Sequence, residues 1–202
     1  MSTESSPHAF PATVDAVLAL FRRRGDDRYG LEDVSQQQHA LQCADLARQE
    51  DADEDLIASA LLHDIGHLLS GDDLPTRLQE DLNDRHESAG ARWLSSLFPR
   101  SVVDPIRMHV AAKRYLCTRE PGYVDRLSST SRKSYEDQGG GMSADALAKF
   151  ESQSHFNAAL KLRRWDDTAK DPEKPTASLE DYRELLCRVA SRRQNSTGDA
   201  GT

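Results

Sequence analysis

The sequence predicts an all-α fold in which helices form a bundle around a central site. Apolar residues recur at helical spacing in segment after segment, and few segments show the period-two alternation that is typical of a strand. Five of the seven histidines fall within or beside the predicted helices. With 202 residues and no internal repeat, the chain is expected to form one domain over residues 13–191, between a disordered N-terminus (1–12) and a flexible tail (192–202).

Several predicted helices begin or end at residues that favour a helix boundary. Asp53 can cap the third helix, and Gly66 lies near its end. Pro99 ends the fourth helix, while Pro105 suits the first turn of the fifth. The run Gln138–Gly141 contains three glycines and is expected to be a loop whose backbone approaches another group closely. The predicted helices are residues 13–24, 35–48, 53–65, 85–97, 105–117, 144–150, 155–166 and 178–191.

Charge and hydropathy disfavour several classes of protein. Acidic residues (34) outnumber basic ones (26), and the formal net charge of −8 argues against nucleic acid as the main partner, because phosphate backbones need a clustered basic surface. No apolar stretch approaches the roughly 20 residues that span a bilayer, so no membrane association is expected, and the first ten residues lack the features of a secretory signal. The three cysteines form no CxxC pair and are interpreted as reduced thiols, which predicts a cytoplasmic protein.

Histidines and aspartates form the clearest candidate site. His63 and Asp64 end the apolar segment ALLHDIGH, where an ionisable pair is unfavourable unless a metal ion compensates. A single histidine is more often an ordinary hydrogen-bonded side chain, but a histidine and an aspartate from two other helices could converge with this pair on one ion. Two further histidines could then hold a second ion, with Asp64 as the bridge. The six candidate ligands are His39, His63, Asp64, His86, His109 and Asp166.

Other residues near these candidate ligands could contact a substrate. His67, Lys113 and Arg163 each lie three or four residues from a candidate ligand and share a face with it where the helix is continuous. Lysine, arginine and serine side chains near metal ions would suit a phosphoryl or phosphonyl group. Spacing alone, however, favours a solvated helix face for Lys113 and Arg163, and ordinary loop chemistry for Tyr29 and Glu32.

The spacing of one histidine, a histidine–aspartate pair and a distant aspartate is that of the HD-domain superfamily, whose members are mostly metal-dependent phosphohydrolases. From about Val14 to Leu186 the sequence more closely resembles the phosphonate-degrading HD-domain oxygenases of the PhnZ type. The segments HVAAKRYL and QGGGM are much more specific than the HD motif alone. The strings that carry the resemblance are QHALQCADLA, ALLHDIGH, RHESAGARWL, MHVAAKRYL, LSSTSRKSYEDQGGGM and LRRWDDTAK.

The resemblance implies an HD-domain helical bundle with a dinuclear centre of two iron ions, in a mixed-valent Fe(II)/Fe(III) state, and O2 as co-substrate. The six candidate ligands match the family's iron ligands, with Asp64 as the bridge. Tyr29 matches a tyrosine that occupies an iron site at rest and swings away when substrate arrives, and Glu32 matches a glutamate that contacts the substrate's amino end. Together with His67 these are the implied catalytic residues. The residues matching those that bind the phosphonate are His67, Lys113, Ser131 and Arg163.

The implied reaction is oxidative cleavage of the C–P bond of (R)-2-amino-1-hydroxyethylphosphonate, which gives glycine and phosphate. An upstream 2-oxoglutarate-dependent hydroxylase could supply this hydroxy-aminophosphonate in the same pathway. A first alternative is the trimethylammonio analogue, which a sister group converts to glycine betaine. A quaternary ammonium favours aromatic faces, for which Tyr29, Tyr115 and Tyr123 are the candidates.

Two further alternatives belong to other classes of HD protein. An HD phosphohydrolase would cleave a nucleotide or phosphomonoester without oxygen. A regulatory HD module would bind a ligand without turnover, but such modules would be expected to lose ligands, and all six ligand positions are filled here. The chain departs from the family pattern at Gln36, Gln37 and Gln38 and in the insert over residues 70–84. Neither departure removes a ligand, and both bear on the shape of the substrate pocket.

Overall fold

The computed structural model describes residues 13–70 and 86–198, with side chains to residue 193, and in these ranges the fold is all-α, as predicted. No strand occurs in the described ranges, where one isolated β-bridge pairs Arg28 with Ser35. The helical elements are α1 (Val14–Arg24), α2 (Gln36–Gln49), α3 (Glu54–Leu62), η1 (Ile65–His67), α5 (His86–Leu94), α6 (Arg100–Arg119), α7 (Tyr123–Arg126), α8 (Ser129–Asp137), α9 (Ala144–Glu151), α10 (Phe156–Thr168), η4 (Leu179–Tyr182) and α11 (Arg183–Gly198).

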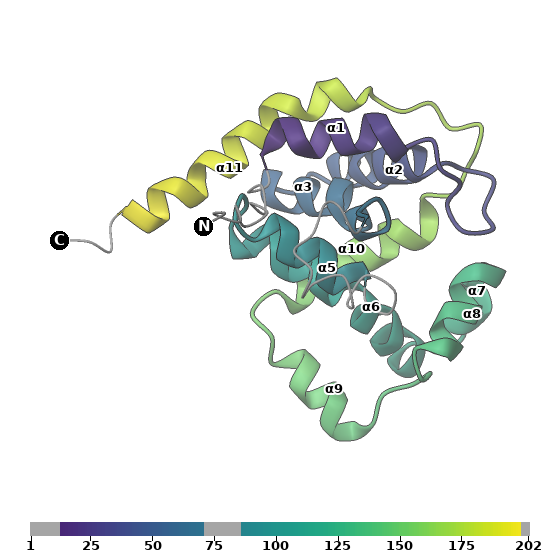
Figure 1. The fold of residues 1–202 in the computed structure, drawn as a ribbon. Coiled ribbons are helices and arrows are strands. Elements are labelled where there is room, and N and C mark those ends of the chain that lie inside the picture. The colour runs from purple at the N-terminus through teal and green to yellow at the C-terminus, as the bar shows by residue number, and fades with distance from the viewer. Residues whose placement is uncertain (1–12, 71–85, 199–202) are drawn as a thin grey trace, which may run out of the picture.

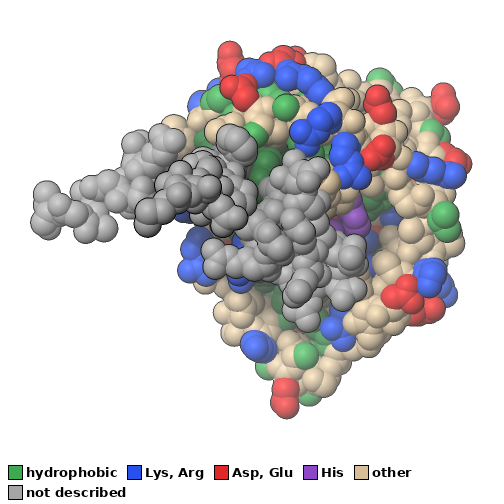
Figure 2. All heavy atoms as spheres, in the orientation of Figure 1, with side chains coloured by type: hydrophobic (Ala, Val, Ile, Leu, Met, Phe, Trp, Pro, Cys, Tyr) green, Lys and Arg blue, Asp and Glu red, His purple; other side chains and the backbone are tan. Residues whose placement is uncertain are grey.

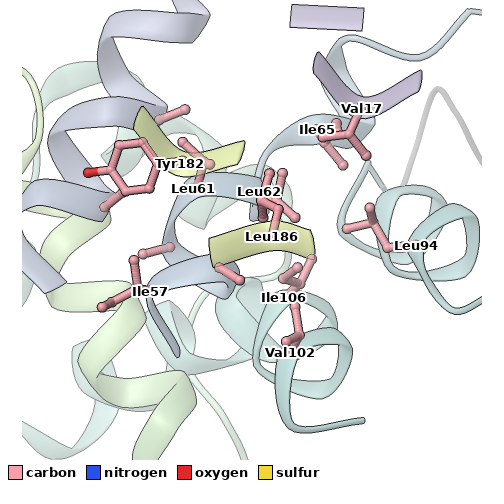
Figure 3. Packing of buried hydrophobic residues seen from close by; sticks show 14 of the residues in the cluster. Val17, Ile57, Leu61, Leu62, Ile65, Leu94, Val102, Ile106, Tyr182 and Leu186 are labelled. Atoms are coloured by element: carbon pink, nitrogen blue, oxygen red, sulfur yellow. The ribbon is translucent and has the colours of Figure 1, made fainter. Parts of the chain in front are cut away.

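Helix α3 is the centre of the bundle (Figure 1). Every residue from Leu56 to Leu62 is buried, and a helix that is apolar on all sides has to be surrounded by other elements. It packs against α2, α6, α10 and α11, while α7, α8 and α9 lie to one side of this bundle. Figure 3 shows side chains of the core that meet around it, among them Val17, Ile57, Leu61, Leu62, Ile65, Leu94, Val102, Ile106, Tyr182 and Leu186.

The two ends of α3 fix the position of the candidate ligands that follow it. Asp53 caps the helix, as predicted, with its carboxylate accepting a hydrogen bond of 2.8 Å from the backbone N–H of Leu56. The α-helix ends at Leu62, before the predicted end at Ile65, and the chain continues into the 3-10 turn η1. His63 and Asp64 therefore follow directly after α3, the most deeply packed helix of the fold, and this packing holds their backbone in place.

The predicted start of the fifth helix at Pro105 was wrong. Helix α6 begins at Arg100, with Pro99 at the N-cap, so Pro105 lies inside the helix. An internal proline removes one backbone hydrogen bond of the helix. Val102 and Val103 are buried in the preceding turn, and their packing against the core compensates for that loss.

Two short helices, α7 and α8, were not predicted. Helix α8 has a single buried residue, Ser131, so it lacks the apolar periodicity on which the sequence analysis depended. Its first turn is held by Ser128, whose hydroxyl oxygen accepts a hydrogen bond of 3.2 Å from the backbone N–H of Ser131. The run after α8 is the expected turn, in which Gly139 and Gly140 have φ values of 90° and 63° that favour glycine.

The remaining boundaries agree with the prediction to within a few residues, apart from the last helix. Helix α11 continues to Gly198, beyond the predicted end at Ser191. The predictions for residues 1–12 and for the loop over residues 71–84 lie outside the described residues. In the described ranges, no helix combines the length and the apolar character that crossing a bilayer requires.

Candidate metal centre and substrate cavity

The six candidate ligands come from five parts of the chain and meet beside the end of α3. All are buried except His86, whose side chain is 19% exposed. They are His39 of α2, His63 and Asp64 directly after α3, His86 at the start of α5, His109 of α6, and Asp166 of α10.

A close backbone contact brings α5 to this place. A Cβ atom at Gly66 would lie 2.0 Å from the carbonyl oxygen of His86, and one at Gly90 would lie 3.0 Å from the backbone nitrogen of Gly66. Only residues without side chains allow this approach of η1 and α5. As a result, Nε2 of His86 lies 3.5 Å from Oδ1 of Asp64.

Asp64 faces two sets of histidines, one with each carboxylate oxygen. Its Oδ2 lies 3.3 Å from Nε2 of His63 and 3.7 Å from Nε2 of His39. Its Oδ1 lies 3.4 Å from Nε2 of His109 and 3.5 Å from that of His86. Burial opposes ionisation, but the surrounding histidines hold the pKa of Asp64 well below its ordinary value. This is the arrangement expected of a carboxylate that bridges two cations.

Asp166 completes the first of these sets. Its Oδ1 lies 3.5 Å from Nε2 of His39, and its Oδ2 lies 3.8 Å from Nε2 of His63. Burial again opposes ionisation, but the guanidinium of Arg163 and the two histidines keep the pKa of Asp166 well below its usual range. The first set is therefore His39, His63 and Asp166, and the second is His86 and His109, with Asp64 common to both.

Backbone carbonyls orient three of the imidazole rings. Because a carbonyl oxygen only accepts, each Nδ1 must carry the proton, and Nε2 is directed into the cluster. The three Nδ1 atoms donate from His39 to Ala169 (2.8 Å), from His63 to Ala60 (2.9 Å) and from His109 to Ile106 (2.7 Å).

One proton is shared inside the first set. The Nε2 atoms of His39 and His63 are 3.1 Å apart, so one of the two rings donates to the other. Burial lowers the pKa of His63, but Asp64 and Asp166 outweigh it and raise that pKa to about 9. A metal ion bound here would displace this proton.

The donor set fits two metal ions. Oδ1 of Asp64 is buried and accepts no hydrogen bond from any described residue, which is unfavourable for a carboxylate oxygen unless a cation lies beside it. Imidazole and carboxylate ligands suit iron among the first-row metals. The thiol of Cys43, which the sequence analysis did not include, lies 3.9 Å from Nε2 of His39 and adds a soft donor to this side of the cluster.

Tyr29 covers the first set. Its ring stacks on that of His39 with the centroids 3.8 Å apart, and its hydroxyl donates a hydrogen bond of 3.4 Å to Oδ1 of Asp166. Burial, followed by the charges of Asp166 and Asp64, raises the pKa of Tyr29 well above its ordinary value, so the phenol is protonated. The predicted partner of Tyr29, Glu32, lies one turn away, where its Oε1 accepts a hydrogen bond of 2.6 Å from the hydroxyl of Ser128.

A cavity of about 490 Å³ adjoins the cluster. Asp64, His86, His109 and Asp166 line one part of it, and cationic and hydroxyl side chains line another. Figure 2 shows a histidine side chain in a hollow on the face drawn, with Lys and Arg side chains beside it. The polar side chains of the second part include Lys113, Ser131, Ser134, Arg163 and Lys170.

Lys113 and Arg163 are buried in the cavity wall, not solvated as their spacing alone had suggested. Lys113 donates a hydrogen bond of 2.5 Å to the hydroxyl of Ser134, and burial together with the charge of Arg163 lowers its pKa to about 8. The guanidinium of Arg163 donates to Oδ2 of Asp166 at 2.7 Å and is also held by the carboxylate of Asp167. Both cations are thus fixed beside the candidate metal ligands.

The remaining predicted contact residues also lie at the cavity. Ser131 is buried in its wall. His67 lines it as well and stacks on His86, with ring centroids 3.9 Å apart. The sequence analysis missed Ser134 and Lys170. Lys170 lies four residues after Asp166 in LRRWDDTAK, and this spacing was the available signal.

Similarity to known proteins decides the family. The HD-domain family matches residues 37–138, about half of the chain. The chain belongs to the HD-domain family. The HD domain so defined contains five of the six candidate ligands, and Asp166 follows it in the sequence.

Two relatives of this HD-domain chain are named as dioxygenases. The [1-hydroxy-2-(trimethylamino)ethyl]phosphonate dioxygenase (glycine-betaine-forming) of Leisingera caerulea is 38% identical over 180 residues, which are 89% of this chain and 91% of that protein. The hydroxymethylphosphonate dioxygenase of Gimesia maris is 42% identical over 171 residues, 84% of each chain. The uncharacterized protein L432 of Acanthamoeba polyphaga mimivirus is 33% identical over 91% of this chain and 84% of its own. The prediction of an HD-domain oxygenase of the PhnZ type is confirmed.

Proposed function

We propose that this HD-domain oxygenase uses two iron ions and O2 to cleave the carbon–phosphorus bond of a 1-hydroxyphosphonate. The observation that carries the proposal is the pairing of a two-sided metal cluster with a cationic cavity wall. Lys113 and Arg163 are buried within the same cavity as Asp64 and His109. A small dianion bound by these cations would place its neighbouring carbon beside the metal ligands.

The roles of the residues follow from their positions. Lys113, Arg163, Ser131 and His67 would bind the phosphonate oxygens, and the substrate hydroxyl would face the cluster. Tyr29, stacked over His39, would have to leave its place on the first set for the substrate to approach. Glu32 would pair with an ammonium group at the other end of the substrate. When bound, the iron supplies the redox chemistry with O2.

We propose (R)-2-amino-1-hydroxyethylphosphonate as the substrate, with glycine and phosphate as products. One O2 balances this reaction, because the two oxygen atoms appear in the carboxylate and in the phosphate. The pair of charges that the substrate carries matches the carboxylate of Glu32 and the cations of the cavity wall. The chain's contribution is to hold both ends of the substrate, to exclude water and to neutralise the phosphonate.

The trimethylammonio analogue is the second candidate, because the relative from Leisingera caerulea is named for it. A quaternary ammonium prefers a cage of aromatic rings. Of the three tyrosines that could have formed one, Tyr115 packs against Phe150 and Phe156 and donates to Glu151, away from the cavity lining. Tyr123 donates to Asp167. Tyr29 alone of these three lines the cavity, which favours the primary amine.

Phosphate release by iron-loaded protein, in air and under nitrogen, tests the proposal. The compounds are the amino and trimethylammonio 1-hydroxyphosphonates, hydroxymethylphosphonate, and a phosphomonoester as control. Oxygen-dependent release that is fastest from the amino compound is the expected result. If oxygen-dependent release is fastest from another phosphonate, that compound becomes the proposed substrate and the proposed reaction stands. Release from the phosphomonoester alone, equal in air and nitrogen, would identify a phosphohydrolase and contradict the proposal.

The proposal also covers the source of the substrate and the cellular compartment of the enzyme. A 1-hydroxyphosphonate can form by hydroxylation of the parent phosphonate, for which a 2-oxoglutarate-dependent hydroxylase is the proposed partner. We also place the enzyme in the cytoplasm. Its three cysteines are free thiols, as expected in a reducing compartment.

A further inference from the structure

Lys170 lies between the two ends of the proposed substrate site. Its Nζ donates a hydrogen bond of 2.8 Å to the hydroxyl of Ser131 in the cavity wall and one of 3.3 Å to that of Ser128. The same Nζ lies 3.8 Å from Oε1 of Glu32. The side chains of Lys170 and Glu32 are 10% and 17% exposed, so the pair is largely shielded from water.

This pairing places Lys170 in front of the carboxylate that is expected to receive the substrate's amine. Lys170 lines the cavity, whereas Glu32 is not among the described residues that do. Glu32 also accepts a hydrogen bond from Ser128. An ammonium group that enters the cavity therefore reaches Glu32 only if Lys170 moves away from it.

We propose that Lys170 is a substrate-recognition residue that changes partner, from Glu32 in the free enzyme to the phosphonate in the complex. The inference rests on the function proposed above. A shielded cation is more stable with a counter-charge both before and after binding. A zwitterionic substrate provides both charges at once, because its ammonium replaces Lys170 at Glu32 while its phosphonate pairs with Lys170. The flexible stem of a lysine allows its Nζ to move between the two positions.

The exchange makes recognition depend on the amine. Hydroxymethylphosphonate has no ammonium to give to Glu32, so Lys170 would stay with the carboxylate and add nothing to phosphonate binding. The other two cations have no such choice of partner. Lys113 is held by Ser134, and Arg163 is held by Asp166 and Asp167.

The experiment compares Lys170→Met with the wild type on the amino compound and on hydroxymethylphosphonate, each as iron-loaded protein in air. We expect kcat/KM for the amino compound to fall at least about tenfold, as for the loss of one charge-assisted hydrogen bond. For hydroxymethylphosphonate it should stay within about threefold. Glu32→Gln should lower kcat/KM for the amino compound and raise it for hydroxymethylphosphonate, because Lys170 is then released. Lys161→Met, at an exposed position of α10, is the matched control.

Equal losses for both substrates in Lys170→Met would overturn the exchange and make Lys170 a fixed phosphonate ligand. A higher kcat/KM for the amino compound would show that Lys170 only competes with the substrate's ammonium for Glu32. Unchanged kcat/KM values for both substrates would show that Lys170 has no role in recognition. Lys170→Gln replaces Lys170→Met if the latter does not keep the iron content and melting temperature of the wild type. If the wild type releases no phosphate from any phosphonate, the proposed function is wrong. If the wild type is active but Lys170→Met leaves the ratio of the two kcat/KM values unchanged, only the present inference is wrong.

Discussion

At the scale of single residues, Asp64 has the largest predicted effect, because each of its oxygens faces a different set of histidines. Asp64→Ala removes the bridge, so we expect loss of both bound metal ions and at least about a thousandfold loss of activity. Metal analysis and oxygen-dependent phosphate release measure the two effects. Asp125→Ala, at an exposed position on α7, should change neither. An Asp64→Ala variant that stays active would sink the two-metal interpretation.

Lys113 should give the activity a dependence on pH. Its pKa is lowered to about 8 by burial and by the charge of Arg163, so the ammonium is present below that pH and is lost above it. We therefore expect kcat/KM to fall as the pH rises through about 8, by roughly tenfold per unit when the charge is essential. A bound phosphonate favours the ammonium, so the fall in kcat should lie at higher pH.

Lys113→Arg is the informative variant for this dependence, because a guanidinium stays charged throughout the range. Its kcat/KM should no longer fall above pH 8, although its value at pH 7 is lower. Lys113→Ala should weaken substrate binding while the iron content stays at the wild-type level. A fall above pH 8 that persists in Lys113→Arg would assign the titration to another group.

The six candidate ligands could be predicted from the sequence, because a histidine–aspartate pair at the end of an apolar helix is costly to bury without a metal ion. Ser134 and Lys170 were not predicted. Their residue types are common on solvated surfaces, and only their contacts with Lys113 and Ser131 show that they belong to the cavity. The burial of Lys113 and Arg163 could not be predicted from the sequence either, because the elements that cover these side chains are distant in the sequence.

At the scale of elements, the contact between η1 and α5 should be intolerant of any side chain. In Gly66→Ala the new Cβ would meet the backbone of His86 at 2.0 Å, so α5 has to move away. We expect a loss of about 1–3 kcal/mol in the free energy of unfolding. Because His86 moves with α5, the bound metal should also decrease.

Denaturant unfolding and metal analysis of Gly66→Ala check this prediction. Gly141→Ala is the matched control, since its Cβ would meet no backbone atom, but the side-chain hydroxyls of Thr118 at 3.2 Å and Tyr135 at 3.6 Å. A stable, fully loaded Gly66→Ala protein would show that η1 and α5 do not need this close approach to bring His86 to Asp64.

Apolar periodicity predicted the elements of the bundle and α9, but not the short helices α7 and α8. Helices α1, α2 and α3 bury apolar faces that the sequence displays directly. Helix α8 buries only Ser131 and is held by its cap and by long-range hydrogen bonds, which leave no periodic signal. The start of α6 was misplaced because a proline inside a helix is tolerated when the surrounding packing is strong.

At the scale of the whole molecule, metal should stabilise the fold, because the ligands join elements that are far apart in the sequence. Adding Fe(II) under nitrogen to metal-free protein, at about 100 times the dissociation constant, should add roughly 2.7 kcal/mol for each site. For a chain of this size that corresponds to a rise of roughly 5–10 °C in Tm. Differential scanning calorimetry measures the shift. The same addition to Asp64→Ala should leave Tm unchanged, and a wild-type Tm that ignores the metal would contradict the fit of the donor set.

The order of the ligands along the chain has a consequence for biosynthesis. His39, Cys43 and His63 leave the ribosome early and form a group whose donor atoms lie within 4.8 Å of one another in the finished fold. Two imidazoles and a thiol are a set that zinc and copper bind readily. Asp166, on α10, is made last of the six ligands, about one hundred residues after His63. A growing chain would thus offer a site for zinc or copper before the ligand set of the proposed iron centre is complete, so loading with iron would require α10 to be in place first.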